Sequence, residues 1–338
     1  TTQDVRATMP LFSPVKYEKV VSVGNGVEAT FHDAGHVLGS AMVRVSIKGN
    51  DEQRTVIFSG DIGRWDKPIL NDPTLFDQAD YVVMESTYGD RLHDPVEDMS
   101  KTLAEAINVA VKAKGNIVIP TFALERAQEV LFYLSRLLFE DRIPHLLVFL
   151  DSPMAVTITD VFDRHPEMFD KAMLELIHGR KSPFAFPTLK LVNTVDESKA
   201  INRIIGSVII MAGSGMCTGG RIKHHLVNNI SKTRNTILFV GYQAAGTLGR
   251  QIVDKAKKVR ILGKRYRVKA RVVQLDGFSA HADRDELMRW LSGFQRSPRR
   301  LFVTHGEPSI SESFADMVRR KMGWEVVVPG YRDEVLLG

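Results

Sequence analysis

Four short stretches of the chain place a histidine or an aspartate beside glycine where an apolar run ends. They are DAGHVLGS with His36, FSGDIG with Asp61, GFSAHAD with His281 and VTHGEP with His305. Imidazole nitrogens and carboxylate oxygens are ligands that suit zinc better than magnesium. A lone histidine of this kind is more often a hydrogen-bonded structural residue. Several of them, each closing an apolar strand, favour one shared metal site.

Asp61 is expected at the tip of a strand, and an aspartate in that position has a particular chemical use. Its two oxygens can bridge two metal ions, and a metal pair can hold both the attacking and the leaving oxygen of a phosphoryl displacement. The pattern therefore indicates metal-assisted hydrolysis.

The elements that must position these residues alternate between strands and helices. Segments 124–138 and 283–294 have the 3.6-residue apolar spacing of helices, and Asp283 is a candidate cap for the second. Short β-rich segments that end in Gly, Ser, Thr, Asp or His predict strands within 81–86, 115–122, 145–152, 207–215, 235–242, 271–279 and 300–307. This alternation predicts an α/β fold with parallel pairing.

The first part of the chain has a different pattern. It predicts antiparallel hairpins with turns at Gly24-Asn25-Gly26 and at Gly49-Asn50-Asp51. The 338 residues, of which 44% are hydrophobic, are enough for roughly two domains. No apolar run reaches the ~20 residues of a membrane span. The single cysteine, Cys217, excludes an internal disulfide and is expected to be buried, so a cytoplasmic location is the simplest expectation.

Positive charge is concentrated in one segment. The chain has a net charge of +5, but residues 254–271 contain nine basic residues and one acid, a local charge of +8, which leaves about −3 elsewhere. The segment is expected to form a hairpin with its turn at Gly263-Lys264. Its basic face is either a solvated surface or a strip that faces nucleic acid, and the sequence leaves both interpretations open.

The order of the motifs resembles a known family. DAGHVLGS, FSGDIG, MESTYGDR, FSAHAD and VTHGE are similar to motifs of the β-CASP branch of the metallo-β-lactamase fold, which contains ribonucleases and pre-mRNA cleavage factors. TFALERAQE, LDSPMA, GSGMCTGGRIKHHL and NTILFVGYQAAGTLGR also resemble family signatures. The resemblance implies an αββα sandwich, its N-terminal part missing, with an inserted α/β β-CASP domain. The expected segments are 1–91, 92–254 and 255–338, the middle one being the insertion.

The resemblance also implies roles for individual residues. His36, Asp61 and His305 match zinc ligands, with Asp61 as the bridging aspartate of a site for two zinc ions. His281 matches the catalytic histidine near the scissile phosphate, and Glu85 matches an acid that orients a histidine, plausibly His281. A histidine at the position of His305 is typical of members that act on RNA rather than DNA.

One departure from the family pattern is large. The metal-binding motif His-x-His-x-Asp-His is absent from the 338 residues, and in family order it would precede them. The interpretation favoured here is an N-terminally shortened chain, and the alternative is a pseudo-nuclease that has lost its metal centre. On either interpretation the chain alone is expected to be weakly active or inactive.

Further residues are candidates for binding the substrate. The glycine loop that contains Ser214 and Gly215 is either a phosphate site before a helix or only a tight turn. Arg221 could add a guanidinium that binds the phosphate through two hydrogen bonds. Arg126 either reaches the cleft that would bind the substrate or pairs with a neighbouring glutamate. Ser279 either binds a phosphate oxygen or caps the turn before the His281 helix. His224 and His225 are interpreted as structural or RNA-contacting residues.

The resulting hypothesis is a zinc-dependent ribonuclease that hydrolyses single-stranded RNA. It would act as an endonuclease, and 5′-to-3′ trimming is not excluded by any motif. The first alternative is a catalytically inactive RNA-binding or scaffold member of the same family. The second is a hydrolase of a small ester, thioester or lactam, which the β-CASP insertion and the basic segment disfavour. Family members often dimerise, so a homodimer is an open alternative, and no membrane association is expected.

Overall fold

The computed structural model describes residues 1–49, 52–93, 96–275 and 277–337. The chain forms two compact units. Unit 1 comprises Thr1–Asp66, Asp72–Leu92 and His281–Gly338, and unit 2 comprises Lys67–Asn71 and His93–Ala280. Among the described residues, no helix is long and apolar enough to cross a membrane.

Unit 1 is built on a seven-stranded sheet of described residues with the order β1-β2-β3-β4-β5-β14-β15. The strands are β1 (Val20–Gly24), β2 (Val27–Asp33), β3 (Ala41–Lys48), β4 (Gln53–Phe58), β5 (Tyr81–Glu85), β14 (Arg300–Thr304) and β15 (Val326–Val327). Strands β1 to β4 pair antiparallel, and β4, β5, β14 and β15 pair parallel. Helix α1 (Thr2–Thr8) and the 3-10 helix η1 (Met9–Leu11) precede the sheet.

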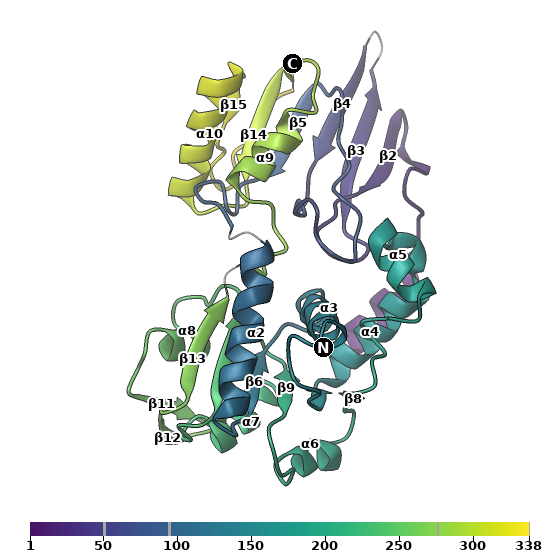
Figure 1. The fold of residues 1–338 in the computed structure, drawn as a ribbon. Coiled ribbons are helices and arrows are strands. Elements are labelled where there is room, and N and C mark those ends of the chain that lie inside the picture. The colour runs from purple at the N-terminus through teal and green to yellow at the C-terminus, as the bar shows by residue number, and fades with distance from the viewer. Residues whose placement is uncertain (50–51, 94–95, 276, 338) are drawn as a thin grey trace. The chain divides into compact units, whose positions relative to one another are not determined.

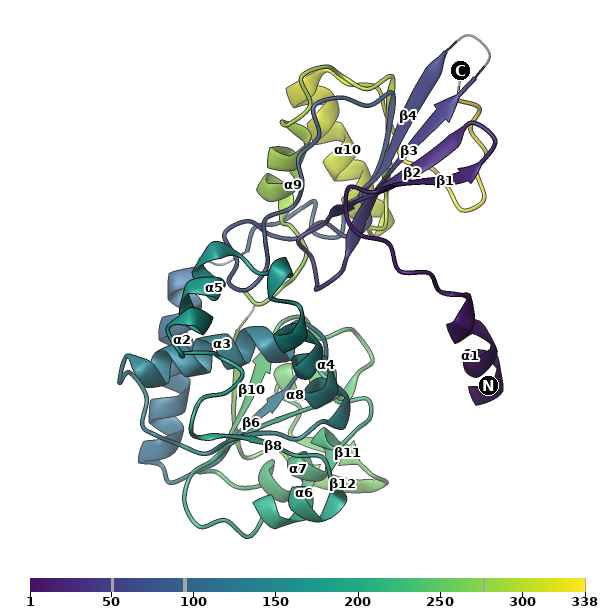
Figure 2. The same cartoon turned by 90° about the vertical axis from the view of Figure 1, so that its right-hand side faces the viewer.

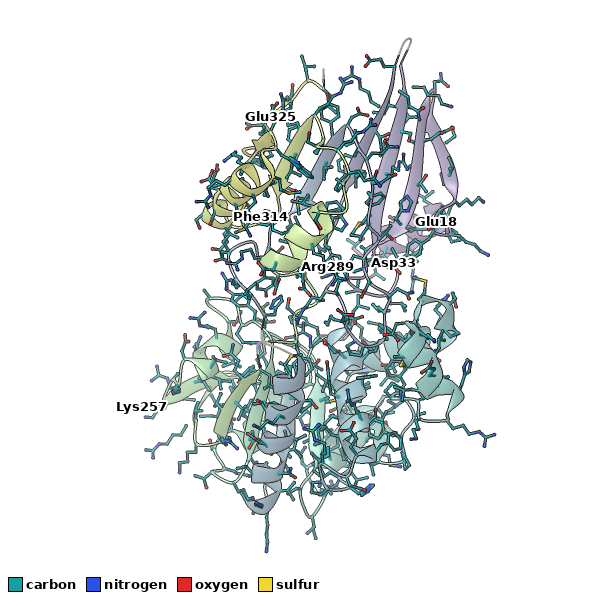
Figure 3. All side chains as sticks on the ribbon, turned by 45° about the horizontal axis from the view of Figure 1, so that its top comes forward. Glu18, Asp33, Lys257, Arg289, Phe314 and Glu325 are labelled. Carbon is teal, nitrogen blue, oxygen red and sulfur yellow. The ribbon has the colours of Figure 1, made fainter. Side chains whose placement is uncertain are left out.

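Helices α9 (Arg284–Leu291) and α10 (Pro308–Met322) lie on one face of this sheet (Figure 1, Figure 2). The core beneath them joins Met42 and Ile57 of the sheet to Trp290 of α9 and Phe314 of α10, all fully buried. Phe314 is labelled on α10 in Figure 3. This layer fixes the strands whose ends carry the candidate metal ligands.

Unit 2 contains a parallel six-stranded sheet of described residues with the order β13-β10-β6-β9-β7-β8. Its strands are β6 (Ile117–Pro120), β7 (Val148–Leu150), β8 (Leu189–Leu191), β9 (Ile209–Ala212), β10 (Thr236–Val240) and β13 (Arg271–Leu275). Its helices are α2 (Val96–Lys112), α3 (Arg126–Phe139), α4 (Pro153–Arg164), η2 (Pro166–Met168), α5 (Lys171–His178), α6 (Val195–Ile201), α7 (Ile222–Asn229) and α8 (Leu248–Val253). Helix α2 crosses in front of the sheet in Figure 1.

The predicted α/β architecture is confirmed. Each of the seven expected strand segments contains an observed strand, and the two expected helices correspond to α3 and α9. Asp283 caps α9, since its side chain accepts from the N–H groups of Asp285 and Glu286. The hairpin at Gly24–Gly26 is present. Strands β3 and β4 also pair antiparallel, although Asn50 and Asp51 of that predicted turn lie outside the described residues.

The two compact units divide the chain differently from the expected segments 1–91, 92–254 and 255–338, which stay a prediction. Unit 2 extends to Ala280, whereas the expected insertion ends at 254. The reason is long-range pairing, because β13 adds a parallel edge strand to β10 from Thr236↔Arg271 to Val240↔Leu275. Unit 2 also takes up Lys67–Asn71, where Leu70 bridges to Phe169. No local sequence signal marks either feature.

Candidate metal centre

The structure brings His36, Asp61, Glu85, His281 and His305 together in unit 1. Asp61 follows β4, Glu85 ends β5, and His305 follows β14. These three strands are parallel neighbours, so their carboxyl ends meet at one edge of the sheet, where α/β proteins place ligands. His36 lies between β2 and β3, and His281 precedes α9.

Asp61 lies between two histidines. Its Oδ1 is 2.9 Å from Nδ1 of His305, and its Oδ2 is 3.7 Å from Nε2 of His36. The Asp61 side chain is 36% exposed, whereas that of His36 is 13% exposed. Each carboxylate oxygen therefore faces a different imidazole, which is the arrangement expected of a bridging ligand.

Glu85 and His281 form a second pair beside Asp61. Nδ1 of His281 lies 3.0 Å from Oε2 of Glu85, whose side chain is 1% exposed. Oε1 of Glu85 accepts the N–H of Ile62 at 2.5 Å, next to Asp61 in the chain. The N–H of Glu85 donates to the hydroxyl of Ser59 at 3.1 Å. The buried carboxylate thus joins the histidine to the Asp61 loop and fixes the orientation of its ring.

Two overlapping groups could hold a metal ion. The ligand atoms of His36, Asp61 and His281 lie within 4.8 Å of one another, and so do those of Asp61, Glu85 and His305. The ring of His281 lies 4.4 Å from that of His36, measured between centroids. Nitrogen and carboxylate donors of this kind fit zinc. The described residues near Asp61 therefore suit zinc chemically, with Asp61 shared by both groups.

Gly63 shows why the Asp61 loop needs a glycine. Its N–H donates to the carbonyl of Ala34 at 2.8 Å. A Cβ at Gly63 would lie 1.9 Å from the carbonyl oxygen of Gly35 and 2.6 Å from the nitrogen of His36. Gly63 also bridges to His281 in antiparallel fashion. The segments that carry His36, Asp61 and His281 therefore meet backbone to backbone at this glycine.

The loop that carries His36 is closed by its own polar groups. The hydroxyl of Ser40 accepts the N–H groups of His36 and Val37, each at 3.2 Å. Asp33, labelled in Figure 3, accepts the N–H of Gly35 at 2.8 Å. Burial raises the pKa of Asp33, although this hydrogen bond opposes the shift. The hydroxyl of Tyr17 donates to the carbonyl of Ser40 and anchors the far side of the loop.

His305 has an unusual backbone conformation. Its φ is 53°, in the left-handed region that non-glycine residues rarely adopt. The hydroxyl of Thr87 donates to its carbonyl at 3.1 Å. A Cβ at the next residue, Gly306, would lie 2.4 Å from the hydroxyl of Ser86. The turn after β14 therefore packs closely against the end of β5. In this arrangement the His305 ring faces Asp61.

Trp65, close to Asp61 in sequence, packs inside unit 1. It is 6% exposed, and the guanidinium of Arg289, labelled on α9 in Figure 3, lies 4.8 Å from the centroid of its ring. The N–H of Trp65 donates to Glu286 of α9. Burial raises the pKa of Glu286, while Arg64 nearby opposes the shift. These contacts tie the Asp61 loop to the helix that follows His281.

The five candidate substrate residues all belong to unit 2. In the glycine loop, the hydroxyl of Ser214 accepts the N–H of Gly219 at 3.2 Å and lies 3.1 Å from the hydroxyl of Thr218. A Cβ at Gly215 would lie 2.7 Å from the ring of Phe122. The loop is a tight turn held by its own contacts, and phosphate binding by Ser214 and Gly215 stays a prediction. Cys217 is fully buried in this loop, as expected.

The side chain of Arg221 contacts a buried acid, Asp151, that was not predicted from the sequence. Its guanidinium donates to Asp151 at 2.6 Å and to the carbonyl of Asn193 at 2.8 Å. Asp151 also lies 2.6 Å from Nε2 of His225 and accepts the hydroxyl of Ser198 at 2.5 Å. His225 is 1% exposed, which supports its structural interpretation.

Burial raises the pKa of Asp151, but hydrogen bonds from His225, Ser198 and Arg221 outweigh it and hold the pKa below 3.8. The signal that could have found this cluster is the i,i+4 spacing of Arg221 and His225, which places both on one face of a helix. Arg221 as a phosphate ligand stays a prediction, and in this structure its guanidinium is held by Asp151.

Arg126 and Ser279 occur in a second buried group. The guanidinium of Arg126 donates to the carbonyl of Val240 at 3.0 Å and lies 3.7 Å from Glu129, as the alternative interpretation expected. Lys67, also missed from the sequence, lies 3.1 Å from Glu129 and donates to the carbonyl of Ser279 at 3.0 Å. Asp283, not Ser279, is the N-cap of α9. Substrate binding by Arg126 and Ser279 stays a prediction.

Comparison with known proteins defines the class. A family model described as the Beta-Casp domain matches residues 127–252, and one described as the Zn-dependent metallo-hydrolase RNA specificity domain matches residues 265–329. The chain belongs to the β-CASP family of the metallo-β-lactamase fold, which confirms the resemblance and the predicted fold class.

Individual relatives support the same assignment. The chain is 39% identical to Ribonuclease TTHA0252 of Thermus thermophilus over 305 residues, which are 90% of this chain and 68% of the relative. It is 32% and 33% identical to the Transcription termination factors FttA of Methanosarcina mazei and Pyrococcus abyssi, covering 94% and 99% of this chain. The chain spans about half the length of these two factors, 51% and 52%.

Proposed function

We propose that this chain carries the site of a zinc-dependent ribonuclease that hydrolyses phosphodiester bonds of single-stranded RNA. The observation that carries the proposal is Asp61, whose two oxygens each face one histidine beside the buried Glu85–His281 pair. The similarity to a protein named as a ribonuclease, and to an RNA specificity domain, favours RNA as the substrate.

His36, Asp61 and His305 would hold the metal, with Asp61 shared between two zinc ions. When bound, zinc supplies a Lewis acid and lowers the pKa of water so that it can attack phosphorus. His36 is braced by Ser40, and His305 is set by the turn against Ser86, so the backbone segments that carry both histidines are held by contacts within unit 1. The partly exposed Asp61 is accessible to both ions.

His281 would exchange a proton with the substrate. Nδ1 is directed at the buried Glu85, and Nε2 would donate to the leaving oxygen or stabilise its developing charge. Glu85 is a positioning residue on this account, because it holds the ring through Nδ1 and holds the Asp61 loop through Ile62. General acid catalysis of this kind contributes about 10²- to 10⁴-fold to the rate.

The test uses a single-stranded RNA labelled at its 5′ end, incubated with the chain and Zn²⁺. We expect slow cleavage that disappears on chelation and in Asp61→Asn, while RNA binding remains. Internal fragments identify an endonuclease, and released mononucleotides identify 5′-to-3′ trimming. RNA that is bound but never cut, even after a segment carrying the motif His-x-His-x-Asp-His is supplied, would instead support the inactive RNA-binding member. Faster turnover of a lactam or thioester would refute the ribonuclease.

A further inference from the structure

The basic segment of unit 2 forms a two-stranded ribbon of β11 (Lys258–Ile261) and β12 (Lys264–Arg267). The predicted hairpin is present, but its turn lies one residue earlier than expected, at Leu262 and Gly263. Both have positive φ, 47° and 81°, as a two-residue hairpin turn with the twist of its strands requires. We call residues 258–267 the basic ribbon.

The inner face of the basic ribbon accounts for its folding. Val259 and Ile261 are buried, at 2% and 1% exposed, in the core that includes Leu226 of α7 and Ile252 of α8. Tyr266, opposite Val259, packs against the same core. The ribbon is therefore anchored by apolar contacts, and its stability does not require the charges on its outer face.

The outer face carries paired like charges. Lys258 lies opposite Arg267, and Arg260 lies opposite Arg265, and all four side chains belong to exposed residues. Like charges directly opposite on neighbouring strands destabilise a sheet. A face that served only solubility would mix both signs. This face therefore carries a cost in stability that the fold does not explain.

Among the residues that the structure describes, no acid forms an ion pair with the basic ribbon. The one acid of the basic segment, Asp254, is 2.9 Å from Arg250, which lies outside that segment. Within the described part of the chain, none of the nine basic residues between 255 and 271 takes part in an ion pair. Figure 3 shows Lys257, beside the ribbon, extending outward from unit 2. The cations are available to a ligand.

The spacing of these cations suits a polyanion. Alternate residues of a strand are about 6.7 Å apart and neighbouring strands about 4.8 Å apart, so the four outer cations form two short parallel rows. A chain with one phosphate per repeat can follow such rows through backbone contacts, without sequence readout. Only Leu262, in the turn, adds a large exposed apolar side chain among residues 258–267, which argues against a lipid surface.

We infer that the basic ribbon is a second RNA-binding surface, which holds phosphates of the RNA through Lys258, Arg260, Arg265 and Arg267. It belongs to unit 2, whereas the candidate metal ligands belong to unit 1. The inference rests on the proposed function for the identity of the polyanion. It resolves the two interpretations of the basic segment in favour of the strip that faces nucleic acid.

The test is a binding measurement in the Asp61→Asn background, which separates binding from cleavage. A variant with all four outer cations replaced by Gln is compared with a control in which four exposed cations elsewhere in unit 2, Lys181, Lys190, Arg203 and Arg234, are replaced by Gln. The probe is a single-stranded RNA without secondary structure, and its Kd is measured from 50 to 300 mM salt.

We expect the ribbon variant to bind at least about tenfold more weakly at low salt, with the slope of log Kd against log salt reduced by about 2–3, since each lost phosphate contact contributes about 0.7. The control should lose much less. The ribbon variant should unfold at the same denaturant concentration or a higher one, because two repulsive pairs are removed.

Three outcomes would contradict the inference or the proposed function. If the parent chain binds RNA and the ribbon variant matches the control in Kd and slope, the inference is wrong while the proposed function stands. If the parent chain does not bind RNA at all, the proposed function itself fails. Unchanged RNA binding together with loss of binding to phosphatidylserine vesicles would assign the ribbon to a membrane surface and overturn the inference.

Discussion

Replacing Gly63 by alanine tests the geometry of the candidate metal centre. A Cβ at this position would lie 1.9 Å from the carbonyl oxygen of Gly35, against an ordinary contact of at least 3.4 Å. The difference is about 1.5 Å, and it falls on backbone atoms that cannot rotate away. The segment carrying His36 must therefore move relative to the segment carrying Asp61.

The size of the effect follows from that displacement. Forcing an extra carbon into a packed site costs about 1–3 kcal/mol of unfolding free energy. A shift of about 1 Å in a functional group costs on the order of 10²-fold. Loss of a supporting contact typically lowers metal affinity by about 10- to 100-fold. We therefore expect Gly63→Ala to remain folded and to bind Zn²⁺ at least about tenfold more weakly than the parent chain.

The assay is competition for Zn²⁺ with a chromophoric chelator, together with urea unfolding of the metal-free protein. Gly24→Ala is the matched control, because a Cβ there meets nothing within 4 Å and its φ is not in the left-handed region. If Gly63→Ala and Gly24→Ala bind Zn²⁺ equally and unfold at the same urea concentration, the close backbone contact does not position His36 and the reasoning is refuted.

Three other residues give separate predictions. Glu85→Gln should slow RNA cleavage by about 10- to 100-fold with little change in the Kd for RNA, because it weakens the contact that orients His281 without altering the RNA-binding surface. If single-turnover kinetics show that binding and turnover are lost equally, a positioning role for Glu85 is contradicted. Asp151→Asn should lower the free energy of unfolding by about 3 kcal/mol near neutral pH, because Arg221 loses its buried partner. The pKa of Asp151 is depressed in the folded state, so its contribution is present above the unfolded value of 3.8 and is lost as the pH falls through the lower folded value. The free energies of unfolding of the parent and Asp151→Asn chains, measured with urea, should therefore differ by a constant amount at pH 5 and 7 and converge below about pH 4. If this difference is the same at all pH values, the charge of Asp151 is not its cause. Cys217, whose pKa burial raises to about 12, should resist a disulfide reagent in the folded chain and react only on unfolding; rapid reaction of the native protein would refute its buried placement.

The sequence was informative about the metal centre for a physical reason. Asp61, Glu85 and His305 each come at or just after the end of a strand, and the carboxyl ends of parallel neighbours share one edge of a sheet. Local patterns of apolar residues and turn residues therefore place these side chains together without knowledge of the full pairing. His281 is identified from the stretch GFSAHAD and from the family resemblance, and Asp283 of the same stretch caps the helix that follows it.

The direction of arginine side chains could not be predicted in the same way. A glycine loop before a helix describes backbone conformation, and it says nothing of whether Arg221 faces outward or inward. Its orientation depends on Asp151, seventy positions earlier, at the end of β7. The pairing of β13 with β10 in unit 2 depends on similarly distant residues. The i,i+4 spacing of Arg221 and His225 places both on one face of a helix, but no local pattern identifies the distant partner of such a contact.

Burial distinguishes the two acids of the candidate centre and thereby their roles. Asp61 and Glu85 end neighbouring strands and were both expected near the metal. Asp61 is 36% exposed and lies between two histidines, so its oxygens are accessible to ions. Glu85 is 1% exposed, with Oε1 occupied by the N–H of Ile62 and Oε2 by His281. With both oxygens hydrogen-bonded in this way, Glu85 can orient the His281 ring. It could bind a metal only by giving up these hydrogen bonds, and hydrogen bonds to a carboxylate are of the stronger kind. Under the proposed function, one of these two carboxylates would therefore serve the metal and the other would orient the proposed catalytic histidine.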